Sequence, residues 1–183
     1  MSAAPVAGLA AGSHRDRSGS GDFSLDPPHR FLVPCRVPSQ VTHIVFGEEA
    51  LARGVRDSAG FLARNGAAFR LGCQGPDLFY HNMRSRPSGI RYGVLLHRRH
   101  YGMVAQGMLE AAKETDPHGP AAAYAIGFVT HGILDRMVHP YIVFFSGWYD
   151  PTFPETRSYR RTHAFFERIL DVLMLRDRRG REI

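Results

Sequence analysis

The segment from Ala121 to Phe145 is the most apolar part of the chain, yet it carries three side chains that a buried helix normally excludes. These are His131, Asp135 and His139, which follow one another at intervals of four residues. Each interval of four turns the side chain by only about 40° in a helix, so all three point to one side. Burying a carboxylate without a partner costs on the order of several kcal/mol, so a positive group must face Asp135.

A second apolar segment, near the C-terminus, repeats this arrangement. His163 and Glu167 are four residues apart, Asp171 is four residues further on, and apolar side chains flank them. Imidazole nitrogens and carboxylate oxygens are donors that zinc accepts, at about 2.0–2.2 Å. Two helices that each carry such a pair therefore favour a metal site.

The rise of a helix limits how these residues can share ions. The Cα atoms of His131 and His139 would lie about 12 Å apart along the axis, whereas residues four apart lie about 6 Å apart and can hold one ion. We therefore expect two ions, one bound by His131 and Asp135 and the other by His139, His163 and Glu167. An ion pair within the helix, between His131 and Asp135, is the alternative without a metal.

Helical spacing along the rest of the chain predicts an all-α fold, since no convincing strand pattern occurs. The predicted helices cover residues 41–54, 58–65 (closed by Gly66), 93–114, 121–139 (ended by Pro140) and 155–176. We interpret residues 39–183 as a single-domain helical bundle around a buried multi-metal site. Residues 1–38, rich in Ala, Gly, Ser, Pro and Arg, are predicted to be a disordered arm.

Composition excludes several classes of protein. No uncharged run of 18 apolar residues occurs, Cys35 and Cys73 are too few for a disulfide framework, and the N-terminus lacks the basic start of a signal peptide. We therefore expect a cytoplasmic protein without a transmembrane segment. The formal net charge is +6, and all but one of the 23 Lys and Arg residues are arginine, which supports a nucleic-acid partner only weakly.

Three further residues are candidate ligands because of their local context. Asp77 follows Gly75 and Pro76 in a rigid loop, His97 lies on an otherwise apolar patch, and His43 lies in the apolar stripe of the first predicted helix. Turn formation is the alternative role for Asp77, because Asp is common in turns.

Six stretches of the sequence, taken in order, match a known pattern. They are Thr42–Ala50 (THIVFGEEA), Leu71–Asp77 (LGCQGPD), Leu95–His97 (LLH), Gly127–Asp135 (GFVTHGILD), His139–Ile142 (HPYI) and His163–Glu167 (HAFFE). Together they resemble the zinc-dependent phospholipase C family, whose superfamily also contains single-strand-specific nucleases. They are most similar to its bacterial branch, which has a GPD loop and an HxxxDxxxHP helix.

This resemblance implies a bundle of helices around three zinc ions. The ligand sets that it implies are Asp77, His97, His131 and Asp135 for the first ion, His139, His163 and Glu167 for the second, and His43 with Asp135 for the third. In the secreted enzymes the third ion also binds an N-terminal tryptophan, but the one tryptophan here is Trp148, so we expect two zinc ions. Family members usually continue for several helices after the last ligands, whereas this chain continues for 16 residues after Glu167, as in a short or truncated member.

The activity that the resemblance implies is zinc-dependent hydrolysis of a phosphate ester, with a phospholipid head group or a nucleotide as substrate. A metal-activated water would be the nucleophile, and Asp77 would orient or deprotonate it. Trp148 and Tyr149 are expected to line the substrate pocket. The arginines available for phosphate contacts are Arg84, Arg86, Arg91, Arg98 and Arg99.

The alternative is a non-catalytic helical zinc-binding domain that contacts nucleic acid or an acidic partner through Arg-rich surfaces. The stretch from Arg157 to Ile183, with eight Arg and four acidic residues, is compatible with this function. Other hydrolase classes lack their motifs, because the chain has no adjacent His-Asp pair, no GxSxG and no P-loop lysine.

Overall fold

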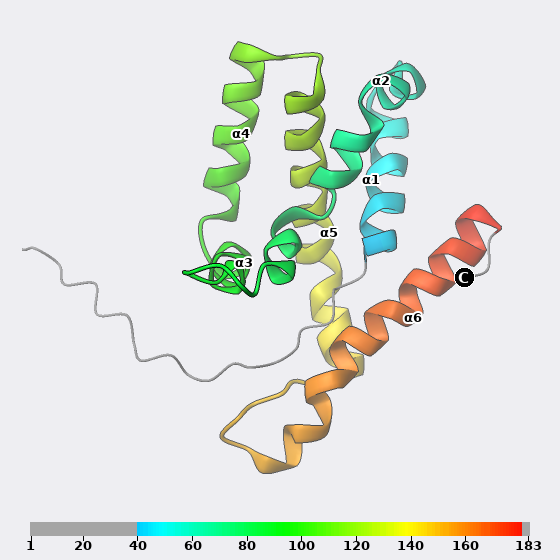
Figure 1. Ribbon diagram of the computed structural model, residues 1–183. Coiled ribbons are helices and arrows are strands. Elements are labelled where there is room, and N and C mark those ends of the chain that lie inside the picture. The colour runs from blue at the N-terminus through cyan, green and yellow to red at the C-terminus, as the bar shows by residue number, and fades with distance from the viewer. Residues whose placement is uncertain (1–39, 181–183) are drawn as a thin grey trace, which may run out of the picture. The chain divides into compact units, whose positions relative to one another are not determined.

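The computed structural model describes residues 40–180, and every regular element in that range is helical (Figure 1). The elements are α1 (Gln40–Gly54), α2 (Ser58–Gly72), the 3₁₀ helix η1 (Gly75–His81), α3 (Gly89–Arg98), α4 (Tyr101–Thr115), α5 (Pro120–Ser146), the 3₁₀ helix η2 (Pro154–Ser158) and α6 (Tyr159–Arg179). The predicted all-α fold is thus confirmed for this part of the chain. The arm predicted for residues 1–38 lies outside the described residues.

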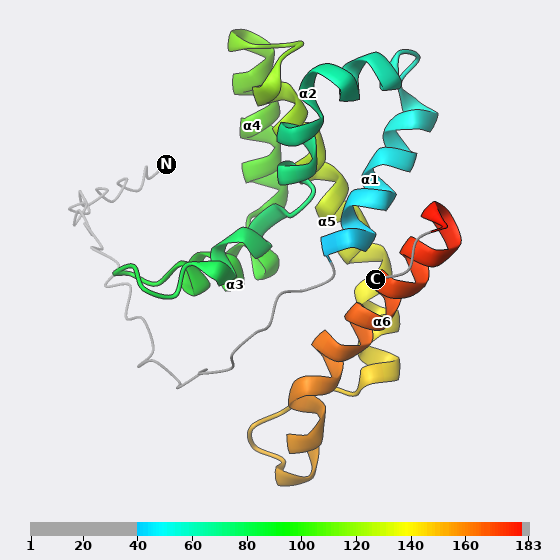
Figure 2. The ribbon, with the colours of Figure 1, turned by 45° about the vertical axis from the view of Figure 1, so that its right-hand side comes forward.

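The central element of the domain is α5, against which α1, α2, α4 and α6 all pack. Figures 1 and 2 both show α4 beside its N-terminal half and α6 beside its C-terminal half. Its buried Phe128, Leu134 and Ile142 are side chains whose burial each contributes about 1.5–3 kcal/mol. Although α5 has 27 residues, neither it nor any other helix within residues 40–180 combines the length and apolar character needed to cross a membrane.

The backbones of α2 and α5 touch where the two helices cross. A Cβ atom on Gly72 would overlap the carbonyl oxygen of Tyr124, and one on Gly127 would overlap the carbonyl oxygen of Phe69. Glycine at both positions therefore permits the close approach. The crossing places the C-terminal end of α2, and the η1 segment that follows it, directly beside α5.

The prediction that the second helix ends at Gly66 is wrong, because α2 continues to Gly72. Glycine inside a helix costs about 1 kcal/mol relative to alanine. The packing of Phe69, which is completely buried against Leu51 and Ala123, offsets that cost. Tertiary packing therefore overrides the local stop signal.

The prediction of one helix over residues 93–114 is also wrong. The chain breaks between α3 and α4 at His100, which adopts the left-handed conformation with φ 64°. A non-glycine residue in this conformation costs roughly 1–2 kcal/mol. Directly after the break, Tyr101 stacks on Phe128 with ring centroids 4.6 Å apart and donates a hydrogen bond to its carbonyl oxygen.

The third incorrect boundary is at Pro140, where the central helix was predicted to end. Proline removes one backbone hydrogen bond of a helix, yet α5 continues to Ser146 and ends before Gly147, with φ 76°. Beyond the proline, Ile142 is buried and Phe145 stacks on Phe166 of α6 with ring centroids 5.9 Å apart. These contacts stabilise the last turns of the helix.

Candidate metal centre

All eight predicted ligands lie close together in the structure, although they come from five different elements. His131, Asp135 and His139 follow the inward face of α5, as their spacing predicts. The remaining ligands are supplied by α1 (His43), η1 (Asp77), α3 (His97) and α6 (His163 and Glu167).

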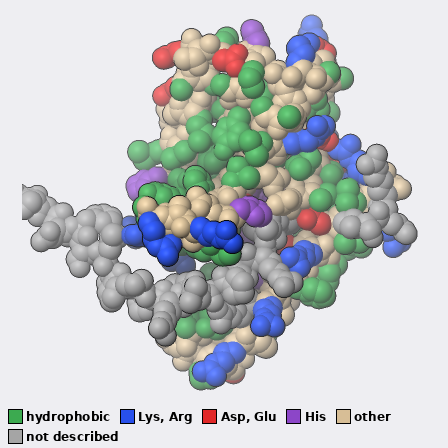
Figure 3. Space-filling view, viewed as in Figure 1, with side chains coloured by type: hydrophobic (Ala, Val, Ile, Leu, Met, Phe, Trp, Pro, Cys, Tyr) green, Lys and Arg blue, Asp and Glu red, His purple; other side chains and the backbone are tan. Residues whose placement is uncertain are grey.

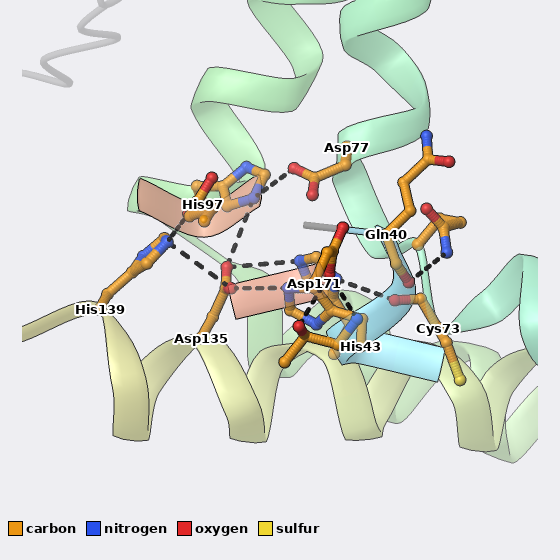
Figure 4. Close-up of polar contacts among 12 residues, drawn as sticks. Gln40, His43, Cys73, Asp77, His97, Asp135, His139 and Asp171 are labelled. Atoms are coloured by element: carbon orange, nitrogen blue, oxygen red, sulfur yellow. Dashed lines mark hydrogen bonds and ion pairs between the residues drawn. The ribbon is translucent and has the colours of Figure 1, made fainter. Parts of the chain in front are cut away.

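Asp135 is the residue on which the others converge (Figure 4). Its Oδ1 lies 3.4 Å from His43 Nε2 and 3.7 Å from His139 Nε2. Its Oδ2 lies 3.3 Å from His131 Nε2 and 3.5 Å from His97 Nε2. Four imidazole nitrogens thus surround one carboxylate. The alternative without a metal, an ion pair between His131 and Asp135, would require only one of them.

The candidate donor atoms fall into three groups. Within each group, the donor atoms all lie within 4.8 Å of one another. We call these the inner group (Asp77, His97 and His131), the middle group (His43, His131 and Asp135) and the outer group (His139, His163 and Glu167). In the outer group, Glu167 Oε1 lies 3.0 Å from His163 Nε2 and 3.4 Å from His139 Nε2. In the inner group, Asp77 Oδ1 lies 3.1 Å from His97 Nε2.

Backbone carbonyls fix the orientation of two imidazole rings. The carbonyl oxygen of Cys73 lies 3.1 Å from His131 Nδ1, and that of Gly93 lies 2.7 Å from His97 Nδ1. Because a carbonyl oxygen can only accept, each Nδ1 must donate, so each Nε2 faces the carboxylates. A backbone hydrogen bond on the distal nitrogen is what metal-binding histidines usually show.

Three buried polar atoms in this centre, Asp77 Oδ1, His131 Nε2 and His43 Nδ1, make no well-formed hydrogen bond with the described residues. The first two nevertheless lie 3.1 Å from His97 Nε2 and 3.3 Å from Asp135 Oδ2, at ion-pair distance. Leaving such an atom unsatisfied costs about 1–3 kcal/mol. For the first two atoms, which belong to the inner group, a bound cation would remove this cost. The eight candidate ligands are five histidines and three carboxylates, and zinc accepts both imidazole nitrogens and carboxylate oxygens.

The backbone next to the centre is adapted to His131. Gly75 has φ 51°, and a Cβ atom there would overlap the imidazole ring of His131. The sulfur of Cys73 lies near the hydroxyl of Thr130 rather than in any of the three groups. Burial raises the pKa of the Cys73 thiol to about 11, so a thiolate ligand is not expected.

The charges of the centre shift its pKa values in opposite directions. Burial raises the pKa of Asp135, but the close imidazoles of His131 and His43 and the charge of His139 outweigh burial and hold the pKa well below 3.8. For Glu167, burial is likewise outweighed, by His139 and His163, and the pKa falls to about 2. The hydrogen bond with Glu167 raises the pKa of His139 above 6.5. Burial lowers the pKa of His97, but Asp77 raises it by more.

The candidate metal centre opens into a pocket of about 690 Å³. Trp148, which is 64% exposed, lines this pocket. Tyr149 instead lines a second pocket of about 410 Å³ with Arg157, Ser158 and Arg161. Of the five arginines proposed for phosphate contacts, Arg98 is the one that lines the larger pocket.

Two tyrosines and an arginine in the pocket wall are not among the residues predicted from the sequence. Tyr80 stacks on His97 with ring centroids 5.6 Å apart, and Tyr101 lies under the ring of His131 at 6.2 Å. Arg136 also lines the pocket. The two tyrosines have no signal in the sequence because they reach the site through tertiary packing, whereas Arg136 follows Asp135 on α5.

Asp171, which continues the spacing of His163 and Glu167, has a different environment. Its Oδ1 accepts hydrogen bonds of 2.7 Å from both the backbone N–H and the hydroxyl of Thr42. Asp171 thus satisfies a free N–H group at the start of α1, the role of a capping carboxylate. It connects α6 to α1 and belongs to none of the three donor groups.

These pKa shifts predict opposite effects of pH on the stability of the metal-free chain and on zinc binding. The raised pKa values of His97 and His139 stabilise the fold below about pH 6.5, and this contribution is lost as pH rises through their folded-state values. The lowered pKa values of Asp135 and Glu167 stabilise it above about pH 4.5, and this contribution is lost as pH falls. The metal-free chain should therefore be most stable between these limits.

Zinc affinity should instead rise from pH 6 to 8, because protons leave the same imidazole nitrogens that zinc would bind. Thermal unfolding in a chelator from pH 4 to 9, and zinc titration at each pH, measure the two trends. An unfolding temperature of the metal-free chain that climbs steadily from pH 6 to 8.5 would contradict the assignment of these ion pairs.

A family model described as zinc dependent phospholipase C matches residues 42–183, a range that includes all eight candidate ligands. Comparisons with curated proteins and with solved structures find no match.

Proposed function

The chain belongs to the zinc-dependent phospholipase C family, and we propose that it hydrolyses phosphate esters with zinc bound at the metal centre. The substrate class is a phosphodiester, either a phospholipid head group or a nucleotide. The observation that carries the proposal is the convergence of four His Nε2 atoms on Asp135, two of them on rings whose other nitrogen donates to the backbone.

Two zinc ions fit the donor groups best. The inner group, together with Asp135, offers four ligands, and the outer group offers three, which leaves a position for water or substrate. His131 belongs to both the inner and the middle group. If His131 and Asp135 both serve the inner ion, the middle group keeps only His43 as a ligand of its own, which is too few for a third ion.

Zinc in these positions would lower the pKa of a water molecule and offset the charge of the phosphate oxygens. The protein's contribution is to orient the donors and to accept the proton. Asp77 is suited to the second task, because it is a buried carboxylate that lines the pocket, and the oxygen that does not bind the ion can accept a proton. Trp148, at the exposed end of the same pocket, can pack against the organic part of the substrate.

The test combines elemental analysis with an assay on a chromogenic phosphodiester. We expect about two zinc ions per chain and hydrolysis that chelation abolishes and zinc restores. Asp77→Asn should lower kcat by about 10²- to 10⁴-fold, the usual effect of losing a general base. Asp177→Asn, an exposed carboxylate on α6, is the matched control and should leave kcat unchanged.

Two results would contradict the proposal. If the purified chain held no zinc after incubation with the metal, the proposal of a zinc-binding centre would be wrong. Tight zinc binding without hydrolysis of any phosphodiester, combined with salt-dependent binding of nucleic acid, would favour the non-catalytic zinc-binding domain instead.

A further inference from the structure

Two arginines line the pocket at the candidate metal centre, and neither pairs with a carboxylate of the described residues. Arg98 ends α3 and Arg136 follows Asp135 on α5, and both side chains are exposed. Within residues 40–180, no ion pair or hydrogen bond joins either guanidinium group to another residue. The carboxylates that line the same pocket, Asp77, Asp135 and Glu167, each lie within 3.5 Å of at least one imidazole nitrogen.

The segment of the chain to which Arg98 belongs is strongly basic. Between Asp77 and Glu110 the sequence contains five arginines, Arg84, Arg86, Arg91, Arg98 and Arg99, and no acidic residue. Figure 3 shows basic side chains over α3, with a histidine side chain at the surface next to them. The free charges beside the pocket are therefore positive, which raises the local concentration of anions.

The pocket offers little to a cationic head group. Recognition of a quaternary ammonium uses aromatic faces or a free carboxylate. The rings of Tyr80 and Tyr101 already stack on His97 and Phe128, at 5.6 and 4.6 Å, and the carboxylates are engaged by histidines. Trp148 is the one exposed aromatic ring among the described residues that line this pocket.

We propose that the pocket selects phosphodiesters that carry a second anionic group, and that Arg98 and Arg136 determine this specificity. Guanidinium groups bind phosphates and carboxylates through paired, charge-assisted hydrogen bonds. With the phosphate to be cleaved at the metal centre, a second phosphate or carboxylate on the same substrate reaches the two arginines on the pocket wall. This inference rests on the proposed function, and it narrows the substrate class to anionic esters.

Matched substrates test the proposal by activity. One pair is dihexanoyl phosphatidylinositol with and without a 4-phosphate, and the other is the p-nitrophenyl ester of thymidine 5′-phosphate with and without a 3′-phosphate. We expect kcat/KM to be about 10- to 100-fold higher for the member with the second phosphate, as for a charged hydrogen bond. The pair with the larger ratio identifies the lipid or the nucleotide as the source of the anion.

Variants assign the preference to the two arginines. Arg98→Gln and Arg136→Gln should each reduce the ratio within a pair several-fold, whereas Arg91→Gln, an exposed arginine on α3 outside the pocket, should leave it unchanged. Equal kcat/KM values within both pairs would overturn the proposal. An equal loss of preference in Arg91→Gln would also overturn it, because the effect would then be general surface charge.

A binding measurement separates this inference from the proposed function. Calorimetric titration of inositol 1-phosphate and inositol 1,4-bisphosphate into the chain should show about tenfold tighter binding of the bisphosphate, lost in Arg98→Gln. If no phosphodiester is hydrolysed but this preference holds, the proposed function fails and the anion site remains. If hydrolysis occurs and the two inositol phosphates bind equally, the anion site fails alone.

Discussion

Replacing Asp135 with asparagine is expected to remove at least one zinc ion per chain and to abolish hydrolysis. The variant keeps the size of the side chain but replaces the charged carboxylate that faces four imidazole nitrogens with a neutral amide. Substitutions in the surroundings of a metal ligand already cost about 10- to 100-fold in affinity, so loss of the ligand itself should cost at least 100-fold. Elemental analysis and zinc titration measure the effect.

The matched control is Asp57→Asn. Asp57 is exposed and accepts a hydrogen bond from the backbone N–H of Gly60 at the start of α2, and asparagine serves equally well in that position. Its zinc content should equal that of the unmodified chain. If Asp135→Asn retained both the zinc content and the unfolding temperature of the unmodified chain, the metal centre would have to be abandoned.

Gly127→Ala should strongly destabilise the fold, because it adds a methyl group where α2 and α5 cross. A Cβ atom there overlaps the carbonyl oxygen of Phe69 and lies 2.8 Å from the backbone nitrogen of Cys73, so α2 and α5 would have to separate. Overpacking usually costs about 1–3 kcal/mol, and a clash with backbone atoms relaxes poorly, so we expect about 3 kcal/mol or more. Denaturant unfolding of the metal-free chain measures this loss directly.

Gly107→Ala provides the control for this prediction. Gly107 lies inside α4, is exposed, and has nothing within 4 Å of the position of a Cβ atom. Alanine should stabilise the chain there by about 0.5–1 kcal/mol. Similar stabilities for the two variants would mean that α2 and α5 do not cross as closely as described.

The helices could be predicted from the sequence wherever apolar spacing dominates. The first and last helices, at residues 41–54 and 155–176, lie close to α1 and α6. The errors lie where packing outweighs a local signal. Gly66 and Pro140 resemble helix ends, but Phe69 and Phe145 pack on the far side of each.

The break at His100 is the opposite case. Here the helix stops although the local sequence contains no stop signal. The residues from Arg98 to Tyr101 include no glycine or proline. The left-handed conformation of His100 is compensated by contacts between Tyr101 and Phe128, which are distant in the sequence. Such long-range contacts cannot be read from a helical pattern.

The candidate ligands could be identified because they are polar residues in apolar surroundings at a spacing of four. The surroundings of these ligands could not be predicted, because they include backbone groups that every residue type possesses. The carbonyl oxygens of Cys73 and Gly93 orient two histidines, yet any residue at those positions has such an oxygen. Likewise, the sequence alone cannot distinguish Arg98, which lines the pocket, from its neighbour Arg99, which does not.

The unequal depth of the donor groups has a consequence for handling the protein. In the outer group His139 and His163 are 39% and 37% exposed, whereas the side chains of Asp77 and His131 in the inner group are at most 5% exposed. An ion at the outer position would exchange with the buffer while the deeper one stays in place. The number of zinc ions measured per chain would then depend on how the preparation was dialysed and stored, as well as on the number of sites.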